Sequence, residues 1–155
     1  MSEISIGKKV PDFALQATPE QVIELSKLKG KNIVLFFYPK DNTPGCTKEA
    51  QDFRDHISEF NKLNTLVLGI SRDSIKSHNN FKEKQCLPFE LLSDESETVC
   101  HLFNVIKVKN KYGKQVRGIE RSTFLIDKDG LLQQEWRNVK VDNHIADVLK
   151  AINAL

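Results

Sequence analysis

The chain has 155 residues, with 23 Lys and Arg against 21 Asp and Glu, which gives a formal net charge of +2. This length suits one domain with a sizeable core, so we expect residues 1–155 to form a single domain. So small a charge gives no electrostatic reason to expect a nucleic acid or a membrane surface as a partner.

No apolar stretch is long enough to span a membrane, and the N-terminus lacks the apolar core of a signal peptide. We therefore expect a cytoplasmic protein with no membrane partner. One basic run predicts a solvated loop, because it matches no recognised nucleic-acid-binding motif. Its members are Lys107, Lys109, Lys111, Lys114 and Arg117.

Four strands are expected along the chain. Residues 32–38 (NIVLFFY) and 65–70 (TLVLGI) are continuous runs of β-branched, aromatic and other apolar residues, typical of strands buried on both faces. Residues 123–126 (TFLI) are followed by the turn sequence DKDG and by 131–136 (LLQQEW), which predicts an antiparallel hairpin.

Helices are expected between and after these strands. Ala50, Phe53, Ile57 and Phe60 recur at spacings of three and four, so they mark one apolar face of a helix over 46–62. Similar patterns predict three further helices, over 74–86, 96–104 and 143–152.

The order of these elements predicts the fold class. A strand, a helix and a second strand imply parallel pairing with a right-handed crossover, and the late hairpin adds antiparallel strands. We therefore expect an α/β protein with a mixed central sheet and helices on both faces, thioredoxin-like in outline.

Cys46 follows the strand over 32–38 and precedes the helical pattern. Functional sites of open α/β sheets form beyond the carboxyl ends of strands. There the unpaired N–H groups of a helix's first turn favour a thiolate over a thiol. Pro44 and Gly45 suit a tight turn that would leave the sulfur accessible. Cys46 is therefore a candidate nucleophile, although a lone cysteine also often serves as a small buried hydrophobe.

Other uses of the cysteines are less consistent with the sequence. A cytosolic protein with three cysteines is not expected to carry a structural disulfide framework. The Cys and His residues are scattered and no C-x-x-C is present, so we expect no metal and no other cofactor. Thr43 stands where a thioredoxin-like oxidoreductase would have the first cysteine of that motif. This makes dithiol exchange at the loop improbable and favours a single thiolate acting on a small polar substrate.

The segment 37–50 (FYPKDNTPGCTKEA) contains the pattern P-x-x-x-T-x-x-C of peroxiredoxins and resembles their bacterioferritin-comigratory, or PrxQ, branch. The resemblance continues over most of the chain, in 69–74 (GISRDS), 91–94 (LLSD) and 121–127 (RSTFLID). It implies a thiol-dependent peroxidase that reduces hydrogen peroxide and organic hydroperoxides, and branch membership favours a monomer.

The resemblance also implies a role for each matching residue. Cys46 matches the peroxidatic cysteine, which attacks the peroxide and becomes a sulfenic acid. Thr43 matches the threonine that hydrogen-bonds the peroxide, and Pro39 the proline that shields the pocket from water. Arg121 matches the arginine that stabilises the thiolate and polarises the substrate, a role that suits a permanently charged fork of donors.

The resolving cysteine departs from the branch pattern. Gln51 and Lys82 stand where relatives carry a second cysteine. Cys86, one helical turn beyond Lys82, is the candidate resolving thiol, and Cys100 is a competitor whose neighbours suggest packing.

The reductant depends on which thiol resolves the sulfenic acid. Resolution by Cys86 implies thioredoxin as reductant, whereas a one-cysteine cycle implies glutathione, glutaredoxin or another external thiol. A non-enzymatic redox sensor is the alternative from another functional class.

Overall fold

The computed structural model describes residues 4–155. Its helices are α1 (Pro44–Asp55), α2 (Ile57–Lys62), α3 (Ile75–Gln85), α4 (Thr98–Leu102) and α5 (His144–Asn153), with one short 3-10 helix, Leu25–Leu28. Its strands are β1 (Ala14–Ala17), β2 (Gln21–Glu24), β3 (Asn32–Phe37), β4 (Thr65–Ser71), β5 (Glu90–Ser93), β6 (Ile106–Lys111), β7 (Lys114–Ile119), β8 (Ser122–Ile126) and β9 (Leu132–Arg137). No helix within the described residues is long and apolar enough to cross a membrane.

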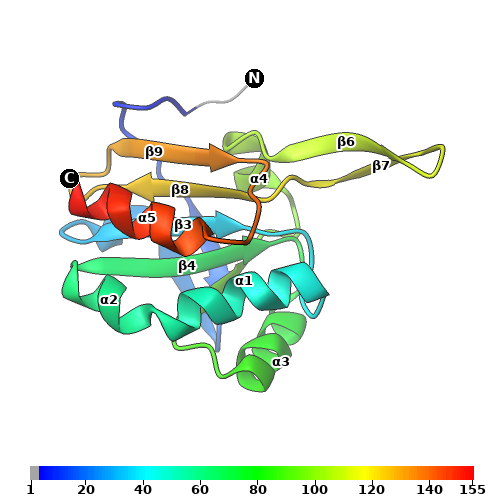
Figure 1. Ribbon diagram of the computed structural model, residues 1–155, viewed down its shortest axis with the longest axis horizontal. Coiled ribbons are helices and arrows are strands. Elements are labelled where there is room, and N and C mark those ends of the chain that lie inside the picture. Colours follow the sequence, from blue (N-terminus) through cyan, green and yellow to red (C-terminus); the bar gives the residue numbers. More distant parts are fainter. Residues whose placement is uncertain (1–3) are drawn as a thin grey trace.

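Seven strands form one twisted sheet in the order β2-β1-β5-β4-β3-β8-β9 (Figure 1). The three central strands β3, β4 and β5 are parallel, and β8 and β9 add the predicted antiparallel hairpin beside β3. The expected mixed sheet is therefore confirmed. The carboxyl end of β3, where the chain turns toward α1, lies beside the start of β8, because Phe37 pairs with Ser122.

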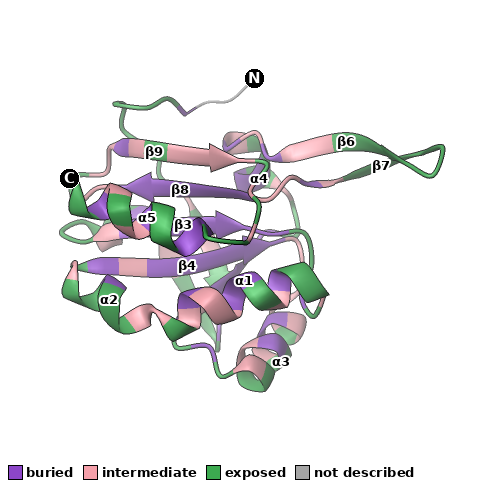
Figure 2. Ribbon diagram, in the orientation of Figure 1, coloured by how far each residue is buried: buried purple, intermediate pink, exposed green. Residues whose placement is uncertain are grey.

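The sheet separates two apolar cores. Val34 and Phe36 of β3 face the core that lies under α1, α2, α3 and α5. Leu35 and Phe37 alternate to the other face, under α4, the 3-10 helix and the N-terminal segment. Both faces are buried, as the continuous apolar run predicts. Figure 2 shows the burial of β3 and β8, in contrast to β6 and β7.

The helix expected over 46–62 is interrupted at His56 and begins two residues earlier, at Pro44. The ring Nδ1 of His56 lies 2.8 Å from the Asp52 carbonyl oxygen. That oxygen would otherwise accept the helical bond from the His56 amide, which instead donates to Phe53 at 3.3 Å. The side chain thus competes with the backbone for the acceptor, and the helix divides into α1 and α2.

The basic run is not the loop we expected. It forms a two-stranded ribbon of β6 and β7 that projects from the body of the molecule (Figure 1). Tyr112 and Gly113 both have positive φ. A two-residue hairpin turn needs this backbone conformation if its twist is to match that of the two strands it joins. The ribbon is mostly exposed, so its charges remain solvated.

Three short strands were also not expected. β1, β2 and β5 have four residues each, too few to show a clear alternation. The other predicted helices form with small shifts at their ends, α4 being the most shortened.

Candidate active site

Cys46 is the third residue of α1, and the loop after β3 leads to it. The first helical hydrogen bond at this end runs from the Thr47 amide to the Thr43 carbonyl, at 2.9 Å. The amides of Gly45 and Cys46 therefore have no acceptor within the helix, and their partial positive charge lies beside the sulfur. This is the local environment that the sequence predicts.

The accessibility expected for the sulfur is wrong. Cys46 is only 2% exposed and belongs to the core cluster that includes Phe36, Ala50 and Phe53. Pro44 and Gly45 are the first two residues of α1 and not a separate tight turn, and the first turn of the helix places the sulfur in the core rather than presenting it to solvent.

Arg121 covers the sulfur from the segment before β8. Its Nη2 donates to Cys46 Sγ at 3.4 Å, and its Nη1 donates to Glu49 Oε1 at 2.7 Å. Burial alone would lower the pKa of Arg121, but Glu49 and the Cys46 sulfur raise it above its ordinary value. The guanidinium therefore stays charged while it faces both groups.

Gly45 makes this approach possible. A Cβ at position 45 would lie 3.2 Å from Arg121 Nη2, closer than ordinary van der Waals contact. The absence of a side chain thus leaves room for the guanidinium beside the sulfur.

Glu49 is a site residue that sequence reasoning missed. It is 1% exposed, and its Oε2 has no hydrogen-bond partner among residues 4–155. Burial raises the pKa of Glu49 to about 7, against the lowering effect of Arg121. The available signal was a carboxylate three residues after Cys46, on the helix face that Ala50 and Phe53 mark as buried.

Thr43 and Pro39 lie on the loop before α1. The Thr43 hydroxyl donates to the Lys40 carbonyl at 2.8 Å, which leaves its oxygen lone pairs available to accept a bond from a substrate O–H. Pro39 is exposed at the start of the loop. The structure therefore brings Cys46 and Arg121 into contact, with Thr43 half-buried one helical turn before the sulfur.

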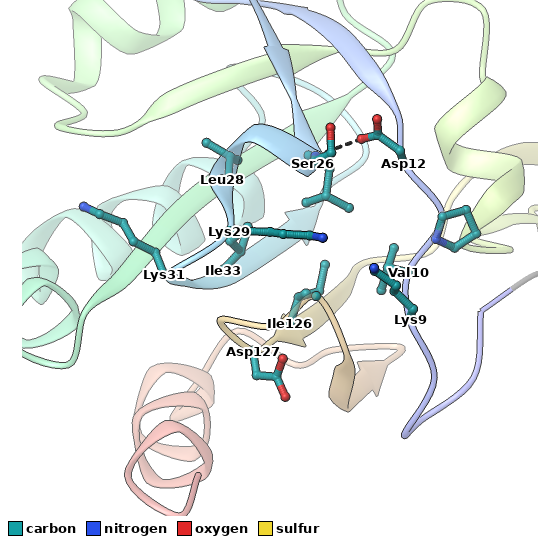
Figure 3. Close-up of a pocket in the computed structure, with 13 residues that line it drawn as sticks. Lys9, Val10, Asp12, Ser26, Leu28, Lys29, Lys31, Ile33, Ile126 and Asp127 are labelled. Atoms are coloured by element: carbon teal, nitrogen blue, oxygen red, sulfur yellow. Dashed lines mark hydrogen bonds between the residues drawn. The ribbon is translucent and has the colours of Figure 1, made fainter.

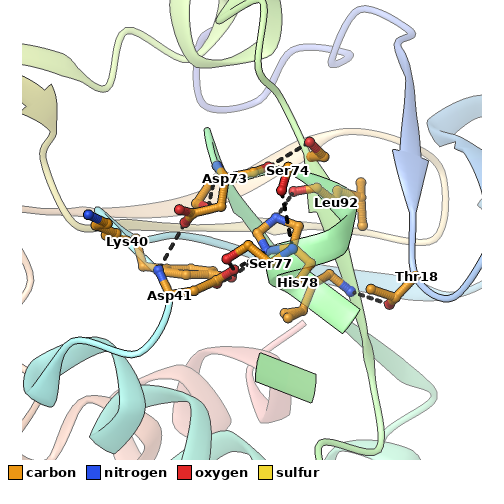
Figure 4. Close-up of polar contacts among 12 residues, drawn as sticks. Thr18, Lys40, Asp41, Asp73, Ser74, Ser77, His78 and Leu92 are labelled. Atoms are coloured by element: carbon orange, nitrogen blue, oxygen red, sulfur yellow. Dashed lines mark hydrogen bonds and ion pairs between the residues drawn. The ribbon is translucent and has the colours of Figure 1, made fainter. Parts of the chain in front are cut away.

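The loop is tied to α3 by a buried polar network (Figure 4). Asp41 Oδ2 lies 2.7 Å from His78 Nδ1 and accepts a bond from the Ser77 hydroxyl at 2.8 Å. His78 Nε2 donates to the Leu92 carbonyl at 2.9 Å, and the Tyr38 hydroxyl donates to Asp41 Oδ1 at 2.6 Å. Burial raises the pKa of Tyr38 well above its ordinary value, and the negative charge of Asp41 is the second largest cause of this rise. This network fixes the conformation of the loop that carries Thr43.

Asp41, Asp73 and His78 offer ligand atoms close enough together to surround a metal ion. These atoms already have protein partners, since Asp73 Oδ2 accepts from the Asp41 amide and from the Ser71 hydroxyl. The cluster is thus a hydrogen-bonded anchor for the loop.

Cys86 is exposed and is the left-handed C-cap residue of α3. The helix predicted over 74–86 included it, but α3 ends one residue earlier, at Gln85. Its neighbour Gln85 contacts α1, accepting bonds from Gln51 Nε2 and from Arg54 Nη1, both at 2.9 Å. Gln51 and Arg54 lie five and eight residues after Cys46, or about 8–12 Å along the helix axis. The end of α3, next to Cys86, thus contacts the same helix as Cys46 but further along it.

Cys100 lies on the other side of the sheet. It is fully buried in the core that contains Leu35 and Phe37, whereas Cys46 belongs to the opposite core. Burial, together with the hydrogen bond and charge of Asp94, raises the pKa of Cys100 far above its ordinary value. All three cysteines are unpaired, and Cys100 has the environment of a packing residue.

The chain matches the model of the AhpC/TSA family over residues 6–135. It is 51% identical to Peroxiredoxin Bcp of Bacillus subtilis over 149 residues, which cover 96% of this chain and 95% of that protein. A solved cysteine variant of Xylella fastidiosa PrxQ superposes with a TM-score of 0.93 at 40% identity, covering 99% of this chain and 98% of that one.

A second solved relative is the Xanthomonas campestris bacterioferritin comigratory protein. It shares 48% identity and a TM-score of 0.87, over 92% of this chain and 90% of its own. Its structures of a trapped intermediate and ligand complex concern the alkyl peroxide reduction activity of that protein. The chain described here therefore belongs to the AhpC/TSA family and, within it, to the bacterioferritin-comigratory or PrxQ branch of the peroxiredoxins, and it is a thiol-dependent peroxidase.

Proposed function

We propose that Cys46 is the peroxidatic cysteine and that Arg121, Thr43 and Pro39 form its substrate pocket. The observation that carries this proposal is the hydrogen bond from Arg121 Nη2 to Cys46 Sγ at 3.4 Å, at a helix N-terminus. A permanent cation and unpaired amides beside one sulfur favour the thiolate, which is the nucleophilic form. Thr43 would accept the substrate's O–H, and Pro39 would limit the entry of water.

In the first half-reaction the Cys46 thiolate attacks one oxygen of the hydroperoxide. An S–O bond forms, the O–O bond breaks, and the second oxygen leaves as an alcohol or as water after taking up a proton. Negative charge develops on that leaving oxygen, and the guanidinium of Arg121 is placed to stabilise it. Cys46 is oxidised to a sulfenic acid and the peroxide is reduced.

In the second half-reaction Cys86 would act as the resolving thiol. Its thiolate attacks the Cys46 sulfur, an S–S bond forms, the S–O bond breaks, and the sulfenic oxygen leaves as hydroxide, which takes up a proton to become water. A disulfide requires Cα atoms about 4.4–6.8 Å apart. Because Gln85, the neighbour of Cys86, contacts α1 about 8–12 Å beyond Cys46 along the helix axis, the first turn of α1 and the end of α3 must unwind for the sulfurs to meet. The left-handed cap at Cys86 is a position where a helix frays readily.

A dithiol protein of the thioredoxin type would then reduce the disulfide and restore both thiols. This reductant follows from the two-cysteine cycle, since the exposed sulfur of Cys86 offers a partner the point of attack. A cycle without Cys86 would instead require glutathione, glutaredoxin or another external thiol to reduce Cys46 directly.

Substrates would be hydrogen peroxide and organic hydroperoxides, as the alkyl peroxide reduction of the Xanthomonas campestris relative suggests. We further propose a monomer in the cytoplasm. Branch membership favours the monomer. Six large apolar residues of the described part are exposed, and three of them lie on the projecting β6–β7 ribbon rather than on the sheet or the helices. The six residues are Ile6, Val22, Val108, Tyr112, Val116 and Leu155.

The test combines rapid kinetics with mass spectrometry. Stopped-flow loss of peroxide should be much faster than with free cysteine and should be abolished in Cys46→Ser. After one equivalent of peroxide, wild type should contain a Cys46–Cys86 disulfide, whereas Cys86→Ser should retain a sulfenic acid at Cys46. Cys100→Ser is the matched control and should behave as wild type. Persistent sulfenic acid in wild type would exclude the two-cysteine cycle, and a rate equal to that of free cysteine would leave only a redox sensor.

A further inference from the structure

A cavity of about 320 Å³ opens at the end of the sheet opposite to Cys46 (Figure 3). It reaches Ile33 at the start of β3 and Ile126 at the end of β8, which pair with each other. Ile33 lies four residues before Phe37, or about 13 Å along the strand, and Cys46 lies beyond Phe37. The cavity is therefore separate from the peroxidase site.

The walls of the cavity are held in place by backbone hydrogen bonds between three segments. The Val10 amide donates to the Gly130 carbonyl at 3.0 Å, and the Gly30 amide donates to the Lys128 carbonyl at 2.9 Å. The Ser26 amide donates to Asp12 Oδ1 at 2.8 Å. These bonds connect the N-terminal segment, the 3-10 helix and the turn after β8, so the cavity is formed before any ligand binds.

The floor is apolar and buried. Val10, Leu25, Ile33 and Ile126 contribute side chains that are at most 7% exposed. At about 30 Å³ for each water-sized group, the cavity has room for about ten such groups. Its volume lies at the lower end of the range for small-molecule sites.

Two lysines lie at the mouth. Figure 3 shows the amino groups of Lys9 and Lys29 directed toward one another, with Lys31 directed away. Neither Lys9 nor Lys29 forms an ion pair with a carboxylate in the described part of the chain. Lys29 lowers the pKa of Lys9. The larger cause is a side-chain hydrogen bond between the two lysines, and the smaller one is repulsion between their charges.

The two carboxylates that line the cavity are engaged elsewhere. Asp12 Oδ1 accepts hydrogen bonds from the amides of Phe13 and Ser26. The positive charge of Lys29 is close enough to interact electrostatically with the Asp12 carboxylate, without forming an ion pair. Asp127 accepts from the amides of Asp129 and Leu131 and from the side chain of Gln133. Two like charges thus meet at the mouth with no described carboxylate within ion-pair distance of either, above an apolar floor.

We propose that this cavity binds a small amphipathic anion, a carboxylate with an apolar tail of about eight carbons' length, as the cavity volume indicates. The carboxylate would lie between Lys9 and Lys29 and accept from both amino groups, and the tail would fill the space above Ile33 and Ile126. Charge-assisted bonds to both amino groups would remove the repulsion between them. The geometry suits this class of ligand because two amino groups outside any described ion pair lie next to an apolar floor.

The test is an NMR titration of the full chain with octanoate below its micelle concentration, observing isotope-labelled methyl groups. Saturable shifts are expected at Leu25, Ile33 and Ile126. Loss of each charge-assisted bond should weaken binding about tenfold. The double variant, in which Lys9→Gln and Lys29→Gln are combined, should therefore bind octanoate about a hundredfold more weakly. Lys8→Gln is the matched control and should bind as wild type, because Lys8 is exposed and does not line the cavity. Peroxide consumption should be the same in all these variants, which separates this test from that of the peroxidase cycle.

Two ligand controls complete the design. Heptanol has the same seven-carbon tail without the charge, and inorganic phosphate has charge without the tail, so both should bind at least tenfold more weakly than octanoate. Equal binding of heptanol or of phosphate would overturn the proposed ligand class. Shifts that are absent, or that persist unchanged in the double lysine variant, would overturn the site.

Discussion

Arg121 donates a hydrogen bond to Cys46 Sγ over 3.4 Å, from a position 75 residues further along the chain. The contact exists because β8 lies beside β3, so that the segment before one strand meets the loop after the other. Neither residue reaches the other through local structure, and the sheet register sets their distance.

We expect Arg121→Lys to slow the reaction with hydroperoxide by about 10²–10³-fold, the usual effect of removing one donor from a developing oxyanion. Lysine keeps the charge but loses the fork that contacts Cys46 and Glu49 together. Stopped-flow peroxide consumption measures the change. Arg117→Lys is the matched control, because Arg117 lies on the exposed ribbon and pairs with Glu97. Equal rates for wild type and Arg121→Lys would contradict the role of the guanidinium.

Glu49 makes the folded state more stable at low pH. Burial raises the pKa of Glu49 from 4.5 to about 7, so folding favours its protonated form. The resulting stability is fully present below pH 4.5 and is lost as the pH rises through 7. A difference of roughly 2.5 in pKa corresponds to about 3 kcal/mol. We expect Glu49→Gln to remove this loss, and urea unfolding between pH 4.5 and 8 measures it. Glu59→Gln, at an exposed position of α2, should leave the pH profile unchanged.

His144 has the opposite dependence. Burial lowers the pKa of His144 from 6.5 to about 4, so folding favours the neutral ring, whose Nε2 lies 2.8 Å from the Thr123 hydroxyl. This stability is present above pH 6.5 and is lost as the pH falls through 4, again by about 3 kcal/mol. The two contributions nearly cancel between pH 4.5 and 6.5.

His144→Asn should therefore make stability fall with rising pH over that interval, and Glu49→Gln should make it rise. Urea midpoints of the two variants, compared with wild type, test the pair. Parallel profiles for the two variants would show that these groups do not set the pH dependence.

The predictable part of the molecule depends on strong local patterns. Residues 32–38 could be assigned to a strand because an uninterrupted apolar run is typical of a strand buried on both faces. The chain that leaves the carboxyl end of this strand leads to Cys46. The four-residue strand β1 could not, because its place follows from a long-range pairing of Gln16 with Ser93. The break at His56 depends on one side-chain contact that no periodicity contains.

The site shows the same division. Cys46 could be identified from its place at a helix start, but its burial under Arg121 depends on packing from a distant segment. Glu49 contacts Arg121 across 72 positions, so its role could not be seen from its neighbours in sequence.

Gly69 occupies a position in β4 where a side chain cannot fit. A Cβ there would lie 2.8 Å from both Leu91 Cδ2 and Phe36 Cζ, which are fully buried. We expect Gly69→Ala to destabilise the fold by about 1–3 kcal/mol, the usual cost of overpacking a core. Gly118→Ala is the matched control, because its Cβ would meet only Arg72 Nη2 at 3.5 Å. Urea unfolding compares the two, and equal stabilities would contradict the steric argument.

Asp41 and His78 connect the loop before Cys46 to α3, the helix that ends at Gln85, just before Cys86. Replacement of the imidazole in His78→Leu would leave Asp41 Oδ2 with only the Ser77 hydroxyl and would remove the side-chain donor to the Leu92 carbonyl. Breaking a buried pair in this way costs about 3 kcal/mol or more.

Because the anchor holds the loop, His78→Leu should also increase amide hydrogen exchange of residues 40–43 and of the first turn of α3. A looser loop would no longer hold Thr43 beside Cys46, so peroxide consumption should slow as well. Asn80→Leu changes an exposed position of the same helix and should alter neither exchange nor rate. If exchange in the loop stayed as in wild type while global stability fell, His78 would act in core packing alone and would not position the loop.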